Sequence, residues 1–186
     1  MNNIDKLSEY KMWAEGIISH TLPRWHELPE IDYYMDQVIE YMEQKLSFFV
    51  IDDASKLISP SIVNNYVKQK LIPSPNKKRY SRNHIAMLLI ICILKPTMAI
   101  GDIQSLINSQ LEKDDLETVY NRFCSNQEDI SKDIFDKEPD FLTNLSDDSL
   151  SLLSMNMSIE SNITKLLADK IVHILKITKE NSDSQQ

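Results

Sequence analysis

Apolar side chains recur at helical spacing in several separate stretches of this chain. The clearest stripe lies between residues 31 and 50, where apolar residues return every three or four positions. The same spacing predicts helices over residues 4–20, 114–123 and 158–177. The chain has only two glycines, and a turn-rich β protein would need more positions that accept positive φ angles. The pattern therefore predicts a mainly helical, all-α protein.

The segment between residues 58 and 106 predicts two more helices, and Ser59 and Pro60 mark the start of the first. The serine hydroxyl can accept an orphan amide hydrogen bond, and proline is preset for the first helical position. Apolar residues then recur at helical spacing as far as Leu71. The positions between them form a predicted outer face made of Ser61, Asn64, Asn65 and Lys68.

The loop after Leu71 contains two prolines and a basic tip, Asn76-Lys77-Lys78. Prolines interrupt a helix, and this tip predicts a small β-hairpin. Ser81 then begins a strongly apolar helix that ends before Pro96. The predicted order is helix, basic hairpin, helix.

The charge of the chain reverses in this region. Between Ala54 and Gly101 there are eight basic side chains and no Asp or Glu, although the whole chain carries −8. The segments before and after sum to −7 and −9. A polyanion can bind a local positive surface on an acidic protein. Alternatively, the cations form a solvated face or dock the acidic flanks, but the short hydrogen-bonding groups beside them favour groove and phosphate contacts.

A longer succession of residues carries a family resemblance: Ser59-Pro60-Ser61, Lys70-Leu71-Ile72, Arg79-Tyr80-Ser81 and the segment MAIGDI at 98–103. This order resembles the DNA-binding half of MerR-type regulators. The wider chain, including LPRWHELPEIDYYMDQV, is similar to an uncharacterised bacterial family of MerR-like transcriptional regulators. The resemblance implies a winged helix-turn-helix with a β-hairpin wing, whose first helix is the one at 31–50.

Three positions depart from the MerR pattern and shift the expected DNA contact. MerR-type proteins usually carry Arg, an aromatic residue and Gly where this chain has Asn64, Asn65 and Lys70. An Asn amide can pair with both edge groups of adenine in the major groove. We therefore expect the two asparagines to read bases.

The sequence thus predicts a DNA-binding transcription regulator, with a recognition helix in the major groove and a basic wing on phosphates. The residues expected to contact DNA are Ser59, Ser61, Asn64, Asn65, Tyr66, Lys68, Lys77, Lys78, Arg79, Tyr80 and Arg82. The competing class is a protein-interaction module with a degenerate helix-turn-helix and no role on DNA. The operator and any small-molecule effector cannot be identified from the sequence.

Four parts are expected along the chain: an N-terminal helix and loop (1–30), the DNA-binding domain (31–110), an acidic helical region (111–179) and a disordered tail (180–186). The helix at 158–177 either closes on the core or pairs with its copy. A single module has a small footprint, so tight specific binding calls for a homodimer.

No pattern of catalytic residues is present, so we expect no enzyme, cofactor or metal. The four histidines are scattered, and neither Cys92 nor Cys124 has a CxxC partner. The longest apolar run has ten residues, too few to span a bilayer, and the N-terminal residues lack the pattern of a secretory signal. The expected location is the cytoplasm.

Overall fold

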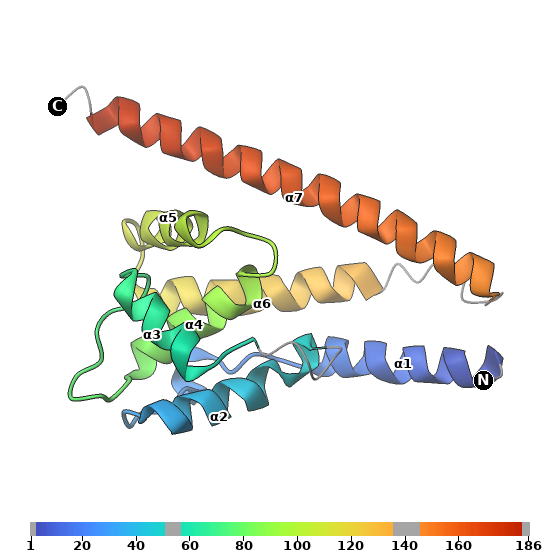
Figure 1. The fold of residues 1–186 in the computed structure, drawn as a ribbon, viewed down its shortest axis with the longest axis horizontal. Coiled ribbons are helices and arrows are strands. Elements are labelled where there is room, and N and C mark those ends of the chain that lie inside the picture. The colour runs from blue at the N-terminus through green and yellow to red at the C-terminus, as the bar shows by residue number, and fades with distance from the viewer. Residues whose placement is uncertain (1–2, 51–56, 136–145, 184–186) are drawn as a thin grey trace. The chain divides into compact units, whose positions relative to one another are not determined.

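The computed structural model describes residues 3–50, 57–135 and 146–183. These residues form seven α-helices and two single-turn 3-10 helices, Trp25–Glu27 and Ser47–Phe49. The α-helices are α1 (Asn3–Ser19), α2 (Met35–Leu46), α3 (Pro60–Lys68), α4 (Arg82–Leu94), α5 (Ile100–Leu111), α6 (Leu116–Phe135) and α7 (Asp147–Asp183) (Figure 1). The main class is therefore helical, as the sequence predicts.

The expected β-hairpin wing is wrong. The described residues contain no strand, and the basic loop holds one single-residue bridge, between Asn76 and Arg79. Their backbones exchange two hydrogen bonds, of 3.1 and 2.9 Å. The next hydrogen-bonded pair of the ladder would be Ser74 with Ser81. The Ser81 N–H instead donates to the His84 Nδ1 at 3.0 Å, and the Ser81 carbonyl accepts from the His84 N–H at 2.9 Å, at the start of α4. Tyr80 pairs with Tyr33, at 2.9 and 2.8 Å. The predicted wing is a tight turn and not a hairpin.

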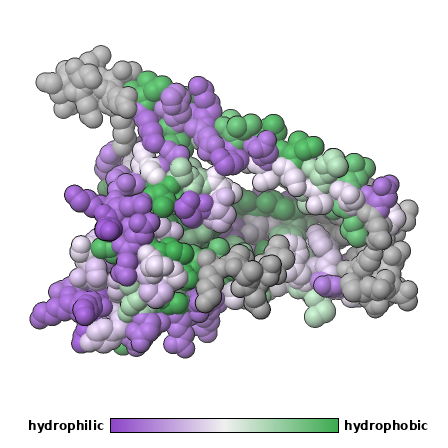
Figure 2. Space-filling model, in the orientation of Figure 1, coloured by the Kyte–Doolittle hydropathy of each residue, from purple (hydrophilic) through white to green (hydrophobic). Residues whose placement is uncertain are grey.

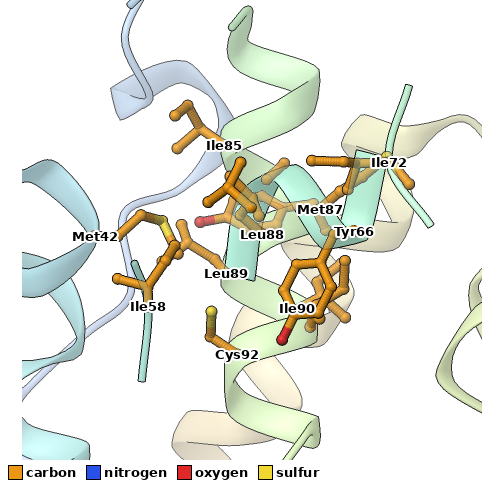
Figure 3. Packing of buried hydrophobic residues seen from close by; sticks show 14 of the residues in the cluster. Met42, Ile58, Tyr66, Ile72, Ile85, Met87, Leu88, Leu89, Ile90 and Cys92 are labelled. Atoms are coloured by element: carbon orange, nitrogen blue, oxygen red, sulfur yellow. The ribbon is translucent and has the colours of Figure 1, made fainter. Parts of the chain in front are cut away.

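The chain divides into two compact units, and the larger, Gly16–Lys132, contains the predicted DNA-binding segment. Its centre is α4, in which every residue from His84 to Cys92 is buried. Figure 3 shows part of this core, in which α4 side chains lie beside Met42, Ile58 and Tyr66. Buried side chains from the four neighbouring helices complete this core: Val38, Met42 and Leu46 of α2, Val63 and Tyr66 of α3, Ile103 and Ile107 of α5, and Tyr120 and Cys124 of α6. The buried surface of α3 is thus fixed by the core.

Helix α3 begins where the sequence predicts. The Ser59 hydroxyl accepts a hydrogen bond of 3.3 Å from the Ile62 N–H, and Pro60 is the first helical residue. The stretch between α2 and α3 is much longer than the roughly 3–4-residue turn of a helix-turn-helix, because it runs from Ser47 to Ser59. Residues 51–56 of this stretch lie outside the described residues.

The C-terminus of α3 is closed by Lys70 in the left-handed region, with φ 58°. The Leu71 N–H donates to the Tyr66 carbonyl at 2.9 Å, and the Lys70 N–H donates to the Val67 carbonyl at 3.0 Å. These two bonds are those of a Schellman motif, whose left-handed position is usually glycine. The motif turns the chain into the buried residues that precede the basic turn.

The smaller unit comprises Met1–Glu15 and Asp133–Gln186. Within it the Trp13 ring packs edge-on against Phe135, with 5.6 Å between centroids. Its main element is α7, which has 37 residues and is longer than the predicted 158–177 helix. Residues 180–183 of the predicted tail continue α7, and 184–186 lie outside the described residues.

Both acidic helices extend beyond their predicted bounds of 114–123 and 158–177, because α6 continues to Phe135 and α7 begins at Asp147. Apolar spacing fades after Phe123, but polar side chains support the second half of α6. Glu128 accepts a hydrogen bond of 2.7 Å from Arg24, and Gln127 bonds Ser131 at 3.0 Å. None of the described helices combines the length and apolar character needed to cross a bilayer.

Candidate nucleic-acid interface

The outward face of α3 carries four short or cationic polar side chains. Ser61, Asn64, Asn65 and Lys68 are all exposed and follow one another at intervals of three, one and three residues. This spacing places them on one side of the helix. Val63, at 0% exposure, faces the core from the opposite side. The predicted outer face of the helix is therefore exposed.

Few hydrogen bonds occupy these groups. The hydroxyls of Ser59 and Ser61 lie 3.0 Å apart, and the Asn65 Oδ1 accepts from the Gln69 Nε2 at 3.3 Å. Among the hydrogen bonds of the described residues, none uses the Asn64 amide. The Nδ2 donors of both asparagines thus remain available to an external acceptor.

Two of the predicted contact residues belong to the core instead. Tyr66 is 4% exposed and Tyr80 is 3% exposed. Burial raises the pKa of Tyr66 to about 12 and also raises the pKa of Tyr80. The Tyr80 ring packs edge-on against His84, with 5.4 Å between centroids. Both tyrosines sit on the inward side of their segments, so their side chains are placed to pack rather than to touch DNA.

The basic turn exposes Lys77, Lys78 and Arg79. Both lysines have positive φ angles, 49° and 64°, as the central residues of a type I′ turn require. The Arg79 Nη2 donates to the Tyr34 hydroxyl at 3.1 Å, and its guanidinium lies 5.1 Å from the Tyr34 ring centroid. The turn therefore exposes two lysine side chains, and Tyr34 orients the third cation, Arg79.

Arg82 interacts with two side chains of the protein itself. It is half-buried, its Nη2 lies 3.8 Å from a Glu30 carboxylate oxygen, and its guanidinium lies 5.8 Å from the Trp25 ring centroid. The Nε of Arg82 is buried and has no hydrogen-bond partner. Ser59 is likewise half-buried and caps α3. These two predicted residues contribute less exposed surface than the α3 stripe.

The α3 face and the basic turn lie in the same compact unit and are close along the chain. The segment from Lys68 to Lys77 can span at most about 30 Å when fully extended, and its buried residues, Leu71 and Ile72, hold it against the core. In the space-filling view hydrophilic residues coat the end of this unit that carries the turn (Figure 2). The basic turn, with exposed Lys77, Lys78 and Arg79, thus belongs to the polar surface of this unit.

Sequence reasoning missed Tyr34, which holds Arg79. Tyr34 is not among the predicted contact residues, and it is 47% exposed. An open pocket of about 420 Å³ lies between Tyr34, Asp32, Asn76 and Lys77. Nothing in the local pattern links Tyr34 to Arg79, which lies 45 residues later. Within the described part of the chain, no group of three His, Cys, Asp or Glu is placed to hold a metal ion.

A family model described as "Domain of unknown function (DUF1836)" matches residues 23–123, more than half of the chain. The matched range includes the α3 stripe, the basic turn and the whole of α4. No curated protein and no solved structure matches.

Proposed function

This chain belongs to the DUF1836 family, and we propose that it binds double-stranded DNA sequence-specifically and regulates transcription. The observation that carries the proposal is the exposed face of α3. Ser61, Asn64 and Asn65 are exposed, uncharged hydrogen-bonding groups on one side of a helix whose other side is locked in the core. A helix of this kind fits the major groove, where Asn can pair with adenine.

Phosphate contacts come from the cations around this face. Lys68 lies at the end of the stripe, and Lys77, Lys78 and Arg79 form the exposed turn. None of these four is in an ion pair with an acidic side chain of the described residues. Lysines and arginines placed in this way fix a protein on the backbone of the duplex, while base contacts supply specificity.

A homodimer doubles the length of DNA that the protein contacts. We propose that α7 forms the dimer interface. Apolar side chains on α7 are about half exposed and recur at intervals of three and four residues: Leu152, Met155, Ile159, Ile163, Leu166. Hydrophobic residues line this helix in the space-filling view (Figure 2). Such spacing along a long helix is that of a helix-pairing seam.

The charges of α7 favour antiparallel pairing of two copies. Residues 147–160 contain three acidic and no basic side chains, whereas residues 161–179 contain four lysines and one aspartate. Antiparallel pairing places the acidic half of one copy against the basic half of the other. Parallel pairing would place like charges together, which is unfavourable.

The experiment that tests the proposed function is a fluorescence-anisotropy titration of the full chain against its own upstream intergenic DNA and a shuffled duplex. It is repeated at several salt concentrations. We expect tighter binding to the native sequence and an affinity that falls steeply with salt, because several phosphates are neutralised. A folded protein that binds neither duplex at low salt would instead be an interaction module, and the DNA proposal would be abandoned.

A further inference from the structure

An apolar pocket opens beside α3, on the side of the helix next to its polar face. Its volume is about 320 Å³, within the usual range for small-molecule sites. Its apolar lining comes from α3, α4 and their flanking segments: Leu57, Ile62, Tyr66, Cys92, Pro96 and Ile100. Asn65 and Lys95 also line it, and both are exposed, so they lie at its open side.

Tyr66 brings a hydroxyl to the wall of this pocket. Tyr66 is 4% exposed, and its hydroxyl has no hydrogen bond to any described residue. Figure 3 shows the Tyr66 ring reaching past α4, with the hydroxyl at the level of Cys92. Burial raises the pKa of both groups to about 12, so at neutral pH the phenol is a neutral donor. Tyr66 lines the pocket, so this donor is available to an acceptor on a ligand bound there.

The open end of the pocket holds an unpaired cation. Lys95 follows the last residue of α4 and makes no ion pair with an acidic side chain of the described residues. No acidic residue lies between Ala54 and Gly101, so the segments that line the pocket supply no carboxylate to it. The site therefore offers a positive charge, an apolar wall and a hydroxyl donor.

We propose that this pocket binds a small carboxylic acid with an aromatic or compact apolar body. The carboxylate pairs with Lys95, the body lies against Ile62 and Pro96, and an acceptor on the body receives the Tyr66 hydroxyl. The chemistry is that of a hydroxybenzoate-sized acid. The inference names an effector class for the proposed DNA-binding function and rests on that function for its regulatory part.

Regulation follows from Asn65, which belongs both to the pocket and to the exposed face of α3. A bound carboxylate near Lys95 can accept a hydrogen bond from the Asn65 Nδ2. The same amide cannot then pair fully with an adenine edge. Ligand and specific DNA therefore compete for one side chain, and by linkage each weakens the binding of the other.

The direct test uses 3-fluoro-4-hydroxybenzoate as the probe and ¹⁹F NMR line broadening as the readout, with full-length protein and no DNA. We expect saturable binding, weaker by about tenfold or more in Lys95→Gln because a charge-assisted contact is lost. Tyr66→Phe should also weaken binding. The neutral analogue 3-fluoro-4-hydroxybenzyl alcohol should bind the wild type as poorly as the acid binds Lys95→Gln.

The matched control is Arg122→Gln, because Arg122 lines a second apolar pocket of about 290 Å³ between α4, α5 and α6. Loss of binding in Arg122→Gln but not in Lys95→Gln would place the probe in that pocket and overturn the proposal. Absence of broadening with wild type up to about 10 mM probe would overturn it as well. Circular dichroism of each variant establishes that it is folded.

The regulatory part is tested separately by repeating the anisotropy titration with saturating probe. The ratio of affinities for native and shuffled DNA should fall toward one, and Asn65→Ala should remove this response. Probe binding without any effect on the ratio would refute the coupling. If the protein binds the probe but no DNA in any condition, the proposed function fails while the ligand site stands.

Discussion

The Tyr120 hydroxyl donates a hydrogen bond of 2.7 Å to the backbone carbonyl of Pro23, 97 residues earlier in the chain. Both residues are buried, and Tyr120 is fully inaccessible to solvent. Nearby, the Asn121 Oδ1 accepts from the Trp25 N–H at 2.9 Å, and Arg24 pairs with Glu128. The loop before α2 is thus tied to α6 by polar contacts at several successive residues.

The substitution Tyr120→Phe tests the central bond of this tie. It leaves the Pro23 carbonyl buried, with only the long 3.9 Å contact from the Cys124 thiol. We expect the free energy of unfolding to fall by about 1–2 kcal/mol, the usual cost of leaving a buried acceptor poorly paired. Urea titration followed by tryptophan fluorescence measures the change.

The control for Tyr120→Phe is Tyr34→Phe, which removes an exposed hydroxyl bonded to Arg79. Its effect on unfolding should stay within about 0.5 kcal/mol. Equal losses in the two variants would mean that the burial of the Tyr120 bond does not matter.

The elements of the fold were predictable wherever local chemistry decides them. Ser59-Pro60 begins α3 at the predicted residue, and α4 stops just before Pro96. The predicted β-hairpin is wrong because the residues that follow the turn use their backbone groups for other partners. The Ser81 backbone, which would make the next ladder bonds, is bonded to His84 at the start of α4, and the Tyr80 backbone pairs with Tyr33, 47 positions earlier. A pairing over that distance leaves no mark in a local pattern.

The candidate site was predictable on α3, where periodicity alone separates the inner and outer faces. Ser61 and Asn64 are exposed as predicted. Tyr66 lies on the inner face, because its ring packs in the core around α4. The Tyr34–Arg79 contact and the pocket at Lys95 both depend on tertiary packing. Residues that meet only through the fold cannot be paired from one sequence.

Lys70→Gly should stabilise the protein. Lys70 occupies the left-handed region at φ 58°, where an L side chain is strained and glycine is not. Glycine also loses more entropy on folding, which offsets part of the relief of strain. We expect the free energy of unfolding to rise by about 0.5–1 kcal/mol. Differential scanning calorimetry measures this gain as a rise in Tm.

The matched variant is Lys68→Gly, because Lys68 lies within the helix. Its free energy of unfolding should fall by about 1 kcal/mol. A fall in both variants would contradict the role of the φ angle.

His84 should make stability depend on pH. Its Nδ1 lies 3.0 Å from the Ser81 N–H, which donates to it, and burial lowers the His84 pKa below 6.5. The unfolded chain therefore binds a proton more readily than the native state. Stability is fully present above about pH 6.5 and falls as the pH drops through the native pKa.

Urea midpoints measured from pH 7.5 to 5 should show this fall in stability, and His84→Gln should reduce it. The exposed His26→Gln serves as the control and should keep the wild-type slope; an unchanged slope in His84→Gln would exclude His84 as the cause.

The two classes of DNA contact should separate by mutation. Asn64→Ala should cost about 1–3 kcal/mol of preference for the native sequence over the shuffled duplex, because a base-edge contact is lost. Lys78→Ala should weaken binding to both duplexes alike and reduce the salt slope by about one. Both substitutions replace an exposed side chain, so stability is little changed. Anisotropy at several salt concentrations measures both quantities, and similar effects of the two variants on the shuffled duplex would remove the assignment of Asn64 as a base reader.

The α7 seam should govern self-association. Ile163 is 59% exposed and lies in the middle of the apolar stripe, so Ile163→Asp would bury a charge in the seam of a dimer. We expect sedimentation velocity to show a dimer for the wild type and a monomer for Ile163→Asp. Ser161→Asp adds the same charge two positions away, at an exposed residue off the stripe, and should remain dimeric. A wild type that is monomeric at tens of micromolar, or a dimeric Ile163→Asp, would reject this surface.

The orientation of the two α7 helices in the dimer is tested separately. We expect antiparallel pairing, because one half of α7 is acidic and the other half is basic. Spin labels on Ser151→Cys can be read selectively, since Cys92 and Cys124 are buried. With a rise of about 1.5 Å per residue, antiparallel copies paired about the middle of α7 would hold the two labels about 40 Å apart. Parallel copies would bring them within about 20 Å, since neighbouring helix axes lie about 10 Å apart. The longer distance would also place the two α7 C-termini at opposite ends of the pair, as the attraction between residues 147–160 and 161–179 requires.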